Sequence, residues 1–342
     1  MSLVPTGLVA IPDITPFPRR RNNAIIFGNP PNLEPAVRVG PREKAIDHLG
    51  RGCGRRTSGT PGVLNKVTTA AFTVSFWGVR GSLSCPGSEY VRYGGNTSCL
   101  EVRCGKHLLI MDGGTGMRPL GKKLIANGPI DADIFFTHTH LDHIVGLPFF
   151  APLYQPTCTL RLWAGHLKPR TTLKDALSGM MVEPLFPVPL DVFASRPDYH
   201  DFAAGEVLTP RPGITVRTTP LNHPNGATGY RIDFDGRSLC YVTDCEHKPG
   251  TLDPLILDLV KGADLFVYDS TYTDAEFAKY AGWGHSTWQE GVRLADTAKV
   301  KQLVLFHHDP SHDDDFMDKV VAEANKLRPG TIAAREVLEL SV

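Results

Sequence analysis

The stretch FFTHTHLDH, residues 135–143, decides how this chain folds and which chemistry it carries. It begins in an apolar run that is typical of a buried strand and ends in a polar loop. Three of the chain's 13 histidines and one aspartate fall within six positions, as His138, His140, Asp142 and His143. Side chains alternate along an extended segment, so His138 and His140 point the same way, and a turn near Leu141 would bring Asp142 and His143 to a neighbouring point. Because imidazole and carboxylate groups bind zinc, iron and manganese, the stretch predicts one loop that serves two adjacent metal positions.

Further ligands should lie downstream, since one loop cannot complete the ligand shells of two ions. Three candidates occupy comparable places in the sequence. His223 lies in the polar stretch PLNHP, Asp244 directly follows the apolar run 238–243, and His307 directly follows the apolar run 302–306. His308 is the alternative to His307, which we prefer because it comes first after the strand.

Hydrophobic periodicity predicts a mixed α/β domain over residues 71–342. Strands are expected at 72–77, 98–104, 107–112, 133–137, 159–163, 214–219, 228–234, 238–243, 265–269, 302–306 and 336–340. Helices are expected at 115–126, with Thr115 as N-cap, and at 252–261, 287–298 and 314–326. Strands in meanders followed by strands mixed with helices indicate two sheets covered by helices.

Residues 1–70 differ from the rest of the chain. They contain nine prolines and carry ten Lys/Arg against four Asp/Glu, a net charge of +6. Such a composition buries too little apolar surface to offset chain entropy, so we expect a poorly ordered Pro/Arg-rich extension. A nucleic-acid-binding arm is the sharper alternative.

The whole chain has an ordinary composition for a soluble protein. Of its 342 residues 42% are hydrophobic and 21% charged, and the formal net charge is zero. These values favour neither a nucleic-acid binder nor a membrane-surface protein, and no apolar run approaches the roughly 18 residues that span a bilayer. The seven cysteines are scattered and odd in number, which is typical of reduced thiols in a cytoplasmic protein.

The complete pattern, HxHxDH followed by His, Asp and His, resembles the metallo-β-lactamase superfamily. The resemblance implies an αββα four-layer sandwich with two metal ions at one edge between the sheets. It also implies the ligand sets: His138, His140 and His223 for the first ion, Asp142, His143 and His307 for the second, and Asp244 as the bridge. Zinc is the default ion for these ligands, and manganese or iron is the alternative.

Two further features favour the ribonuclease Z and cyclic phosphodiesterase branch of that superfamily. Asp269 and His285 resemble a carboxylate–histidine pair that lies near the metals and protonates the leaving group, although that branch usually has Glu where this chain has Asp269. The opening stretch FWGVRGS (76–82) and the later YGGNTS (93–98) are similar to phosphodiesterase-like members. In this interpretation Arg80 and Asn96 contact the substrate phosphate, whereas the alternative is two tight turns beside strands. Asp112 is expected to support a ligand rather than to be one.

The predicted reaction is hydrolysis of a small or cyclic phosphodiester by a water that two metals activate, with Asp142, His285 and Asp269 as catalytic groups. Transfer-RNA 3′ processing is an alternative, disfavoured because the connection 151–212 shows no evident RNA-gripping arm. A glyoxalase II-like thioesterase is another, disfavoured because about 35 residues follow His307. A non-catalytic metal-binding regulator is a third, disfavoured because no ligand position is lost. We expect no membrane partner, and a homodimer by analogy with related phosphodiesterases.

Overall fold

The computed structural model describes residues 71–342, which form two seven-stranded sheets. The predicted extension 1–70 lies outside the described residues. The first sheet has the order β14-β1-β2-β3-β4-β5-β6, made of β1 (Phe72–Gly78), β2 (Cys99–Cys104), β3 (His107–Met111), β4 (Asp131–Phe136), β5 (Thr159–Ala164), β6 (Asp198–Asp201) and β14 (Glu339–Ser341). The second has the order β13-β12-β11-β10-β9-β8-β7, made of β7 (Val207–Arg211), β8 (Ile214–Leu221), β9 (Ala227–Phe234), β10 (Arg237–Val242), β11 (Leu265–Asp269), β12 (Gln302–Phe306) and β13 (Ile332–Ala333). Both sheets are mixed, since each contains parallel and antiparallel pairs.

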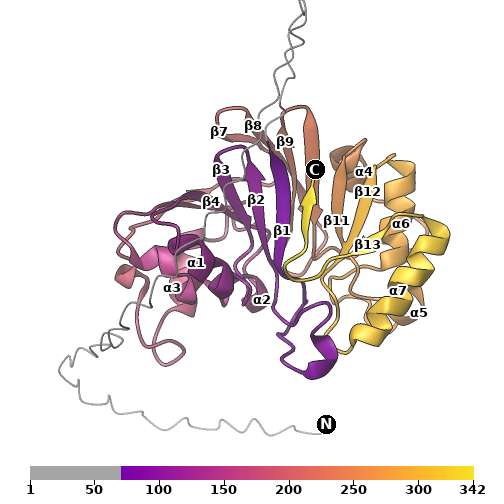
Figure 1. Ribbon diagram of the computed structural model, residues 1–342, viewed down its shortest axis with the longest axis horizontal. Coiled ribbons are helices and arrows are strands. Elements are labelled where there is room, and N and C mark those ends of the chain that lie inside the picture. Colours follow the sequence, from indigo (N-terminus) through magenta and orange to yellow (C-terminus); the bar gives the residue numbers. More distant parts are fainter. Residues whose placement is uncertain (1–70) are drawn as a thin grey trace, which may run out of the picture. The chain divides into compact units, whose positions relative to one another are not determined.

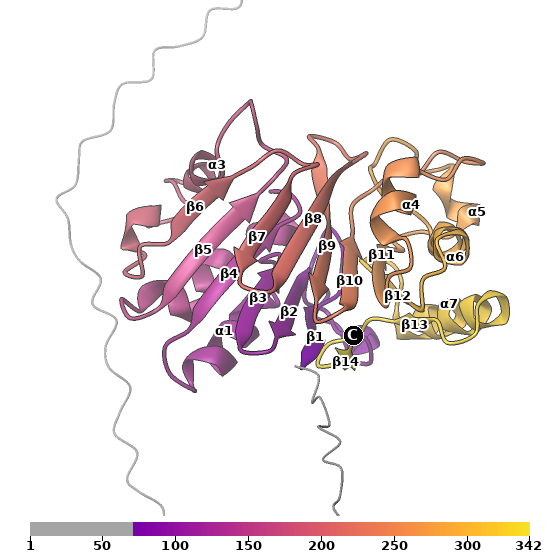
Figure 2. The same ribbon diagram turned by 90° about the horizontal axis from the view of Figure 1, so that it is seen from above.

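Helices cover the outer face of each sheet (Figures 1 and 2). They are α1 (Met117–Ile125), α2 (Leu141–Ile144), α3 (Leu173–Met180), α4 (Pro254–Val260), α5 (Asp274–Phe277), α6 (Trp288–Thr297) and α7 (Asp314–Leu327). Apolar side chains of α1 and α3 pack on the first sheet, and those of α4, α6 and α7 pack on the second. The resulting order of helix, sheet, sheet and helix confirms the predicted αββα sandwich.

The central strands are apolar along their whole length because both of their faces are buried. Phe266 and Tyr268 of β11 point to the helices, whereas Leu265 and Val267 point to the other sheet. The core between the sheets combines residues from β1 to β4 with residues from β8 to β12, and Phe135 of β4 packs edge-on against Tyr230 of β9. This shared core holds the two sheets, and hence their carboxyl-terminal edges, against each other.

Parallel pairing brings several strand ends to one edge of the sandwich. In the first sheet β4 runs parallel to β3 and β5, and in the second β10, β11 and β12 are parallel neighbours. The predicted site residues lie just after these strands, at 138–143 after β4, Asp244 after β10 and His307 after β12. The edge therefore gathers polar groups that lie more than a hundred residues apart in the sequence.

The structure differs from the predicted elements in several places. The short elements α2, α5 and β13 were not predicted, and the last strand, β14, lies at Glu339–Ser341 rather than at 336–340. Helix α1 begins at Met117 rather than Thr115, whose Oγ1 instead accepts the amide of Thr97 at 2.9 Å. Strands β6 and β7 were not predicted. The sequence of β6 is polar, and the edge strand β7 contains Pro210, a residue that argues against a strand because it cannot donate a backbone hydrogen bond. Helix α3 was also missed, although Thr172 caps it and Leu173 and Leu177 form its buried face.

The described cysteines, from Cys85 to Cys245, are all free and buried, in agreement with the expected reduced thiols. Within residues 71–342 no helix has the length and apolar character needed to cross a membrane.

The core between the sheets predicts where shortening a side chain lowers stability most. Leu239 lies between the sheets with its side chain fully buried, so Leu239→Ala should lower the free energy of unfolding by about 2–5 kcal/mol. Urea denaturation followed by circular dichroism measures the change. Leu255→Ala, at an exposed side chain of α4, is the matched control and should cost less than about 0.5 kcal/mol. Equal losses in the two variants would contradict this account of the core.

Candidate metal centre

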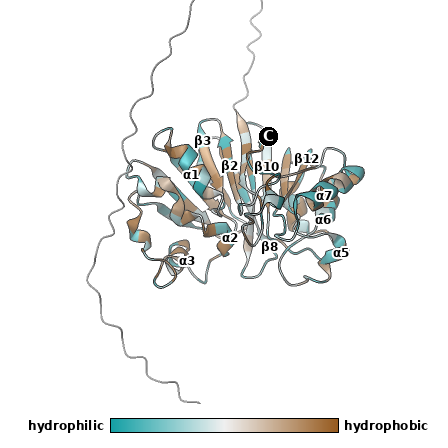
Figure 3. Cartoon of the chain, turned by 60° about the horizontal axis from the view of Figure 1, so that its bottom comes forward, coloured by the Kyte–Doolittle hydropathy of each residue, from teal (hydrophilic) through white to brown (hydrophobic). Residues whose placement is uncertain are grey.

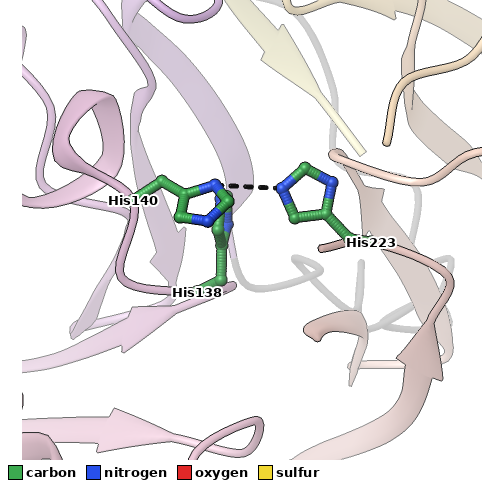
Figure 4. A group of neighbouring side chains, drawn as sticks. All are labelled: His138, His140 and His223. Atoms are coloured by element: carbon green, nitrogen blue, oxygen red, sulfur yellow. Dashed lines mark hydrogen bonds between the residues drawn. The ribbon is translucent and has the colours of Figure 1, made fainter. Parts of the chain in front are cut away.

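Seven side chains form two adjoining groups at the edge where the strands end. His138, His140 and His223 make the first group, drawn in Figure 4, and Asp142, His143, Asp244 and His307 make the second. The ligand atoms within each group lie within 4.8 Å of one another. In the first group Nδ1 of His140 faces Nε2 of His223 at 3.1 Å. The structure thus brings together all seven of the predicted ligands, from both sheets.

Asp244 lies between the two groups and presents one carboxylate oxygen to each. Its Oδ1 is 3.7 Å from Nε2 of His138 and 3.8 Å from Nε2 of His223. Its Oδ2 is 3.2 Å from Nε2 of His143 and 3.4 Å from Nε2 of His307. A carboxylate in this position can bind two ions at once, which is the arrangement expected of a bridging ligand.

The unpartnered nitrogens at the centre fit bound metal ions. Nε2 of His138, His143 and His307 is buried and has no hydrogen-bond partner among the described residues. Three imidazole nitrogens left unsatisfied at one point would be costly in a folded protein, whereas each is a normal zinc ligand atom. The donor set of imidazole and carboxylate groups therefore suits two divalent ions.

Burial and charge set the protonation of the imidazoles in opposite ways in the two groups. Burial lowers the pKa of His138 well below its usual value and lowers those of His140 and His223, which favours the neutral form that binds metal. Burial acts on His143 in the same sense, but the charges of Asp244 and Asp142 outweigh it and raise the pKa of His143. The second group is thus rich in negative charge, which a cation would offset.

The second ring nitrogen of each histidine is held by a partner outside the centre. Nδ1 of His143 is 2.9 Å from Oδ2 of Asp112, as expected from the sequence for a supporting carboxylate. The other four contacts join His307 to Thr271 Oγ1, His223 to the Gly284 carbonyl, His138 to Thr137 Oγ1 and His140 to the Asn225 side chain. Such contacts fix the orientation of each ring and select which nitrogen faces the metal.

The backbone is strained at two of the candidate ligands. Asp244 and His307 have φ of 58° and 63°, in the left-handed region that non-glycine residues seldom adopt. The Gly81 backbone also packs closely against the His307 ring. A Cβ at this position would lie 2.3 Å from the ring, so a larger residue does not fit without a shift. The amide of Ser82 donates to Oδ2 of Asp142 at 2.8 Å, so the segment after β1 holds ligands of the second group in place.

Asp269 and His285 meet beside the centre, as their resemblance to a carboxylate–histidine pair predicts. Nδ1 of His285 is 3.2 Å from Oδ2 of Asp269 and 3.7 Å from Oδ1 of Asp244. Burial opposes protonation of His285, but its hydrogen bond to Asp269 and the neighbouring carboxylates outweigh burial and raise its pKa to about 9. Thr287 caps α6 by accepting the amide of Glu290 at 3.1 Å, so the helix cap and the histidine pair coexist.

The predicted substrate contacts Arg80 and Asn96 both make hydrogen bonds within the fold. Arg80 is fully buried, and its guanidinium donates to the carbonyls of Gly94 and His312. Asn96 donates through its side-chain amide to Glu336 at 3.0 Å. This corrects the sequence interpretation for Arg80, whose guanidinium is directed inward and links the two glycine-rich stretches. The half-buried Asn96 stays a predicted contact.

The structure also separates the two candidate last ligands. His307 joins the second group, whereas His308 is 2.8 Å from the carbonyl of Ala334 through its Nε2 and packs edge-on against Tyr93. Sequence reasoning missed Ser82 and Thr271 altogether. Their only signals were their places immediately after glycine-rich or apolar runs, which many loop residues share.

Comparison with known proteins agrees with this geometry. Residues 111–308, more than half of the chain, match the family described as "Beta-lactamase superfamily domain". The chain belongs to the metallo-β-lactamase superfamily. Ribonuclease Z of Bradyrhizobium sp. (strain ORS 278) is 26% identical over 286 residues, which cover 71% of this chain and 93% of that protein. With the His/Asp centre, these findings make the chain a metal-dependent hydrolase of this superfamily, related to ribonuclease Z.

Two solved structures share the fold. Human tRNase Z, short form, superposes with a TM-score of 0.57 at 22% identity, covering 79% of this chain and 99% of that one. A diphosphatase from the PhnP family superposes with a TM-score of 0.58 at 19% identity, covering 79% and 97%.

The position of Asp244 predicts how metal binding responds to substitution. Asp244→Asn should weaken both ions, by roughly 10-fold or more, because one oxygen faces each group. Asp142→Asn is the matched variant and should weaken one ion, since Asp142 belongs to the second group alone. Metal content by mass spectrometry after dialysis against graded chelator measures both. Loss of a single ion in Asp244→Asn would rule out a bridging role.

Proposed function

We propose that this chain hydrolyses phosphodiesters at a two-metal centre formed by His138, His140, Asp142, His143, His223, Asp244 and His307. The observation that carries the proposal is the Asp269–His285 pair directly beside a carboxylate shared by two ligand groups. Two bound divalent ions, with zinc as first choice, supply charge stabilisation at the phosphoryl oxygens and activation of the attacking water.

The chain's own residues supply orientation and a proton. With the Asp269 carboxylate as acceptor, Nδ1 of His285 carries a hydrogen and Nε2 becomes the atom that transfers a proton. As the bond between phosphorus and the leaving oxygen breaks, Nε2 gives its proton to that oxygen. Asp142, which belongs to the second ligand group and accepts a hydrogen bond from the Ser82 amide, orients the attacking water.

The names of the related proteins help to choose between an RNA and a small phosphodiester as substrate. Ribonuclease Z proteins align with most of this chain, which supports an RNA phosphodiester and favours the alternative over the small-diester prediction. A small diester remains the second candidate. It is supported by the inward turn of Arg80 and by an apolar pocket beside the ligand loop, neither of which suits a polyanion.

A direct comparison of substrates tests the proposal. The metal-loaded chain should hydrolyse bis(p-nitrophenyl) phosphate, and a transfer-RNA precursor with a 3′ trailer should be cleaved if RNA is the substrate. Chelation should abolish either activity, and added zinc or manganese should restore it. Turnover of a thioester alone, with no phosphodiester cleaved, would refute the proposed reaction.

The proton-transfer role of His285 depends on the leaving group. His285→Ala should slow hydrolysis of a diester with an alkoxide leaving group by about 10²- to 10⁴-fold, because that oxygen needs a proton. It should affect a p-nitrophenolate leaving group far less. Single-turnover rates on the two substrates, with metal content checked in parallel, measure the contrast; equal losses on both would exclude proton donation.

A further inference from the structure

His285, the proposed proton donor, lies in the loop that connects α5 with α6. In Figure 3 these two helices lie on the side of the molecule opposite α2 and α3. The loop contains Gly282 and Gly284, whose φ angles of 89° and 88° lie in the left-handed region that glycine adopts readily. Trp283, between them, is 62% exposed. Because the tip of the loop is exposed, hydrogen bonds rather than packing set its position.

One carboxylate oxygen holds the tip of this loop. Oε2 of Glu246 accepts hydrogen bonds from the amides of Gly282 at 2.7 Å and Gly284 at 2.9 Å. The amide of Trp283, between them, donates within the loop to the carbonyl of Tyr280 at 3.0 Å. A charged acceptor makes stronger hydrogen bonds than a neutral one, so Glu246 is a firm anchor for the loop.

Glu246 is itself fixed to the segments that carry two of the candidate ligands. It follows Asp244 by two residues. Its amide donates to the carbonyl of Asn222 at 2.8 Å, and the side-chain amide of Asn222 donates to the carbonyl of Glu246, also at 2.8 Å. Asn222 immediately precedes His223. The anchor therefore connects the loop to the ligand segments of the second sheet.

The loop brings two consecutive residues to the metal centre. The carbonyl of Gly284 accepts a hydrogen bond from Nδ1 of His223 at 2.8 Å, and a Cβ on Gly284 would lie 2.3 Å from the same atom. The next residue is His285, whose Nδ1 is 3.2 Å from Oδ2 of Asp269. Asp269 thus orients the imidazole ring, whereas the distance of the ring from a leaving oxygen depends on where the loop places the His285 backbone.

The backbone on the two sides of His285 is held by different partners. On the following side, the hydroxyl of Ser286 lies 2.8 Å from both the Tyr268 hydroxyl and Nδ1 of His247. On the preceding side, the two hydrogen bonds to Glu246 hold the loop. Removal of the Glu246 carboxylate should therefore free the His285 backbone at one end and leave the other end anchored.

We propose that Glu246 is a positioning residue for proton transfer by His285. By holding the amides of Gly282 and Gly284, its carboxylate keeps Nε2 of His285 within reach of the leaving oxygen as the bond to phosphorus breaks. The inference rests on the proposed phosphodiester hydrolysis, and it applies to an RNA and to a small diester alike, since an alkoxide leaving oxygen needs a proton in either. Glu246 itself belongs to neither ligand group.

Two substitutions at Glu246 in the zinc-loaded full-length chain differ in whether an acceptor remains. Glu246→Met removes both hydrogen bonds with little change in side-chain length, whereas Glu246→Gln keeps a carbonyl oxygen that can accept them. On a diester with an alkoxide leaving group, Glu246→Met should lower kcat at least about 10-fold, because a small misplacement of a catalytic group is costly. On bis(p-nitrophenyl) phosphate it should stay within about threefold of wild type, since p-nitrophenolate leaves without a proton. Glu246→Gln should retain most of the activity on both.

Glu206 offers a matched control. Its Oε1 accepts the amide of Ala203 at 2.8 Å in the connection between β6 and β7. Glu206→Met removes a hydrogen bond of the same kind from a different loop and should behave as wild type on both diesters. Metal content by mass spectrometry and the circular dichroism spectrum should be unchanged in all of these variants.

A double substitution separates positioning of His285 from a general structural role. In the His285→Ala background, adding Glu246→Met should lower kcat on the alkoxide diester by less than about twofold, because its effect acts through His285. If Glu246→Met does not fold, Glu246→Asp takes its place. Its carboxylate is drawn back by one methylene, and it should show the same contrast between the two diesters.

The outcomes separate this assignment from the function beneath it. If wild type hydrolyses neither diester, the proposed phosphodiesterase function falls. If His285→Ala shows no contrast between the diesters, the proton-donor role and the assignment of Glu246 fall together, and the two-metal hydrolysis stands. If Glu246→Met leaves the alkoxide diester unaffected, slows both diesters equally, loses metal or adds its full effect to His285→Ala, only the assignment of Glu246 is overturned.

Discussion

The buried Asp244 carboxylate is the constraint on which this site depends. It turns one oxygen toward His138 and His223 and the other toward His143 and His307, so a single side chain fixes the spacing of both groups. A carboxylate so deeply buried is tolerated only where positive charge or hydrogen bonds compensate it. Here Thr243 Oγ1 donates to Oδ2 at 2.7 Å, and two divalent ions would supply the rest. The left-handed backbone at Asp244 is the local strain that this placement requires.

The sandwich delivers the remaining groups to that carboxylate. Parallel pairing of β10, β11 and β12 brings Asp244, Asp269 and His307 to one edge, and the core shared between the sheets holds β4 and its HxHxDH loop opposite them. Each ring is then fixed from behind, as with Asp112 behind His143. Rigid placement of this kind favours chemistry that relies on preorganised charge rather than on side-chain rearrangement.

The two sides of the centre differ in character. His285, paired with Asp269, stands on the side of α6, whereas the apolar pocket opens on the side of α2 and α3. A relative named ribonuclease Z aligns with 71% of this chain at 26% identity.

The sequence by itself indicated two sheets covered by helices and the candidate ligands that gather at their edge. Apolar runs mark strands that are buried on both faces, and a polar residue directly after such a run lies at the edge of the sheet, so His138 to His143, Asp244 and His307 could be identified without coordinates. The Asp269–His285 contact was expected through family resemblance. Only the tertiary structure decided the rest. Arg80 turns inward because carbonyls more than two hundred residues away accept its hydrogen bonds, and the pocket exists because α3, missed in a weakly patterned connection, packs opposite α2. Both depend on contacts between distant segments, which local periodicity does not encode.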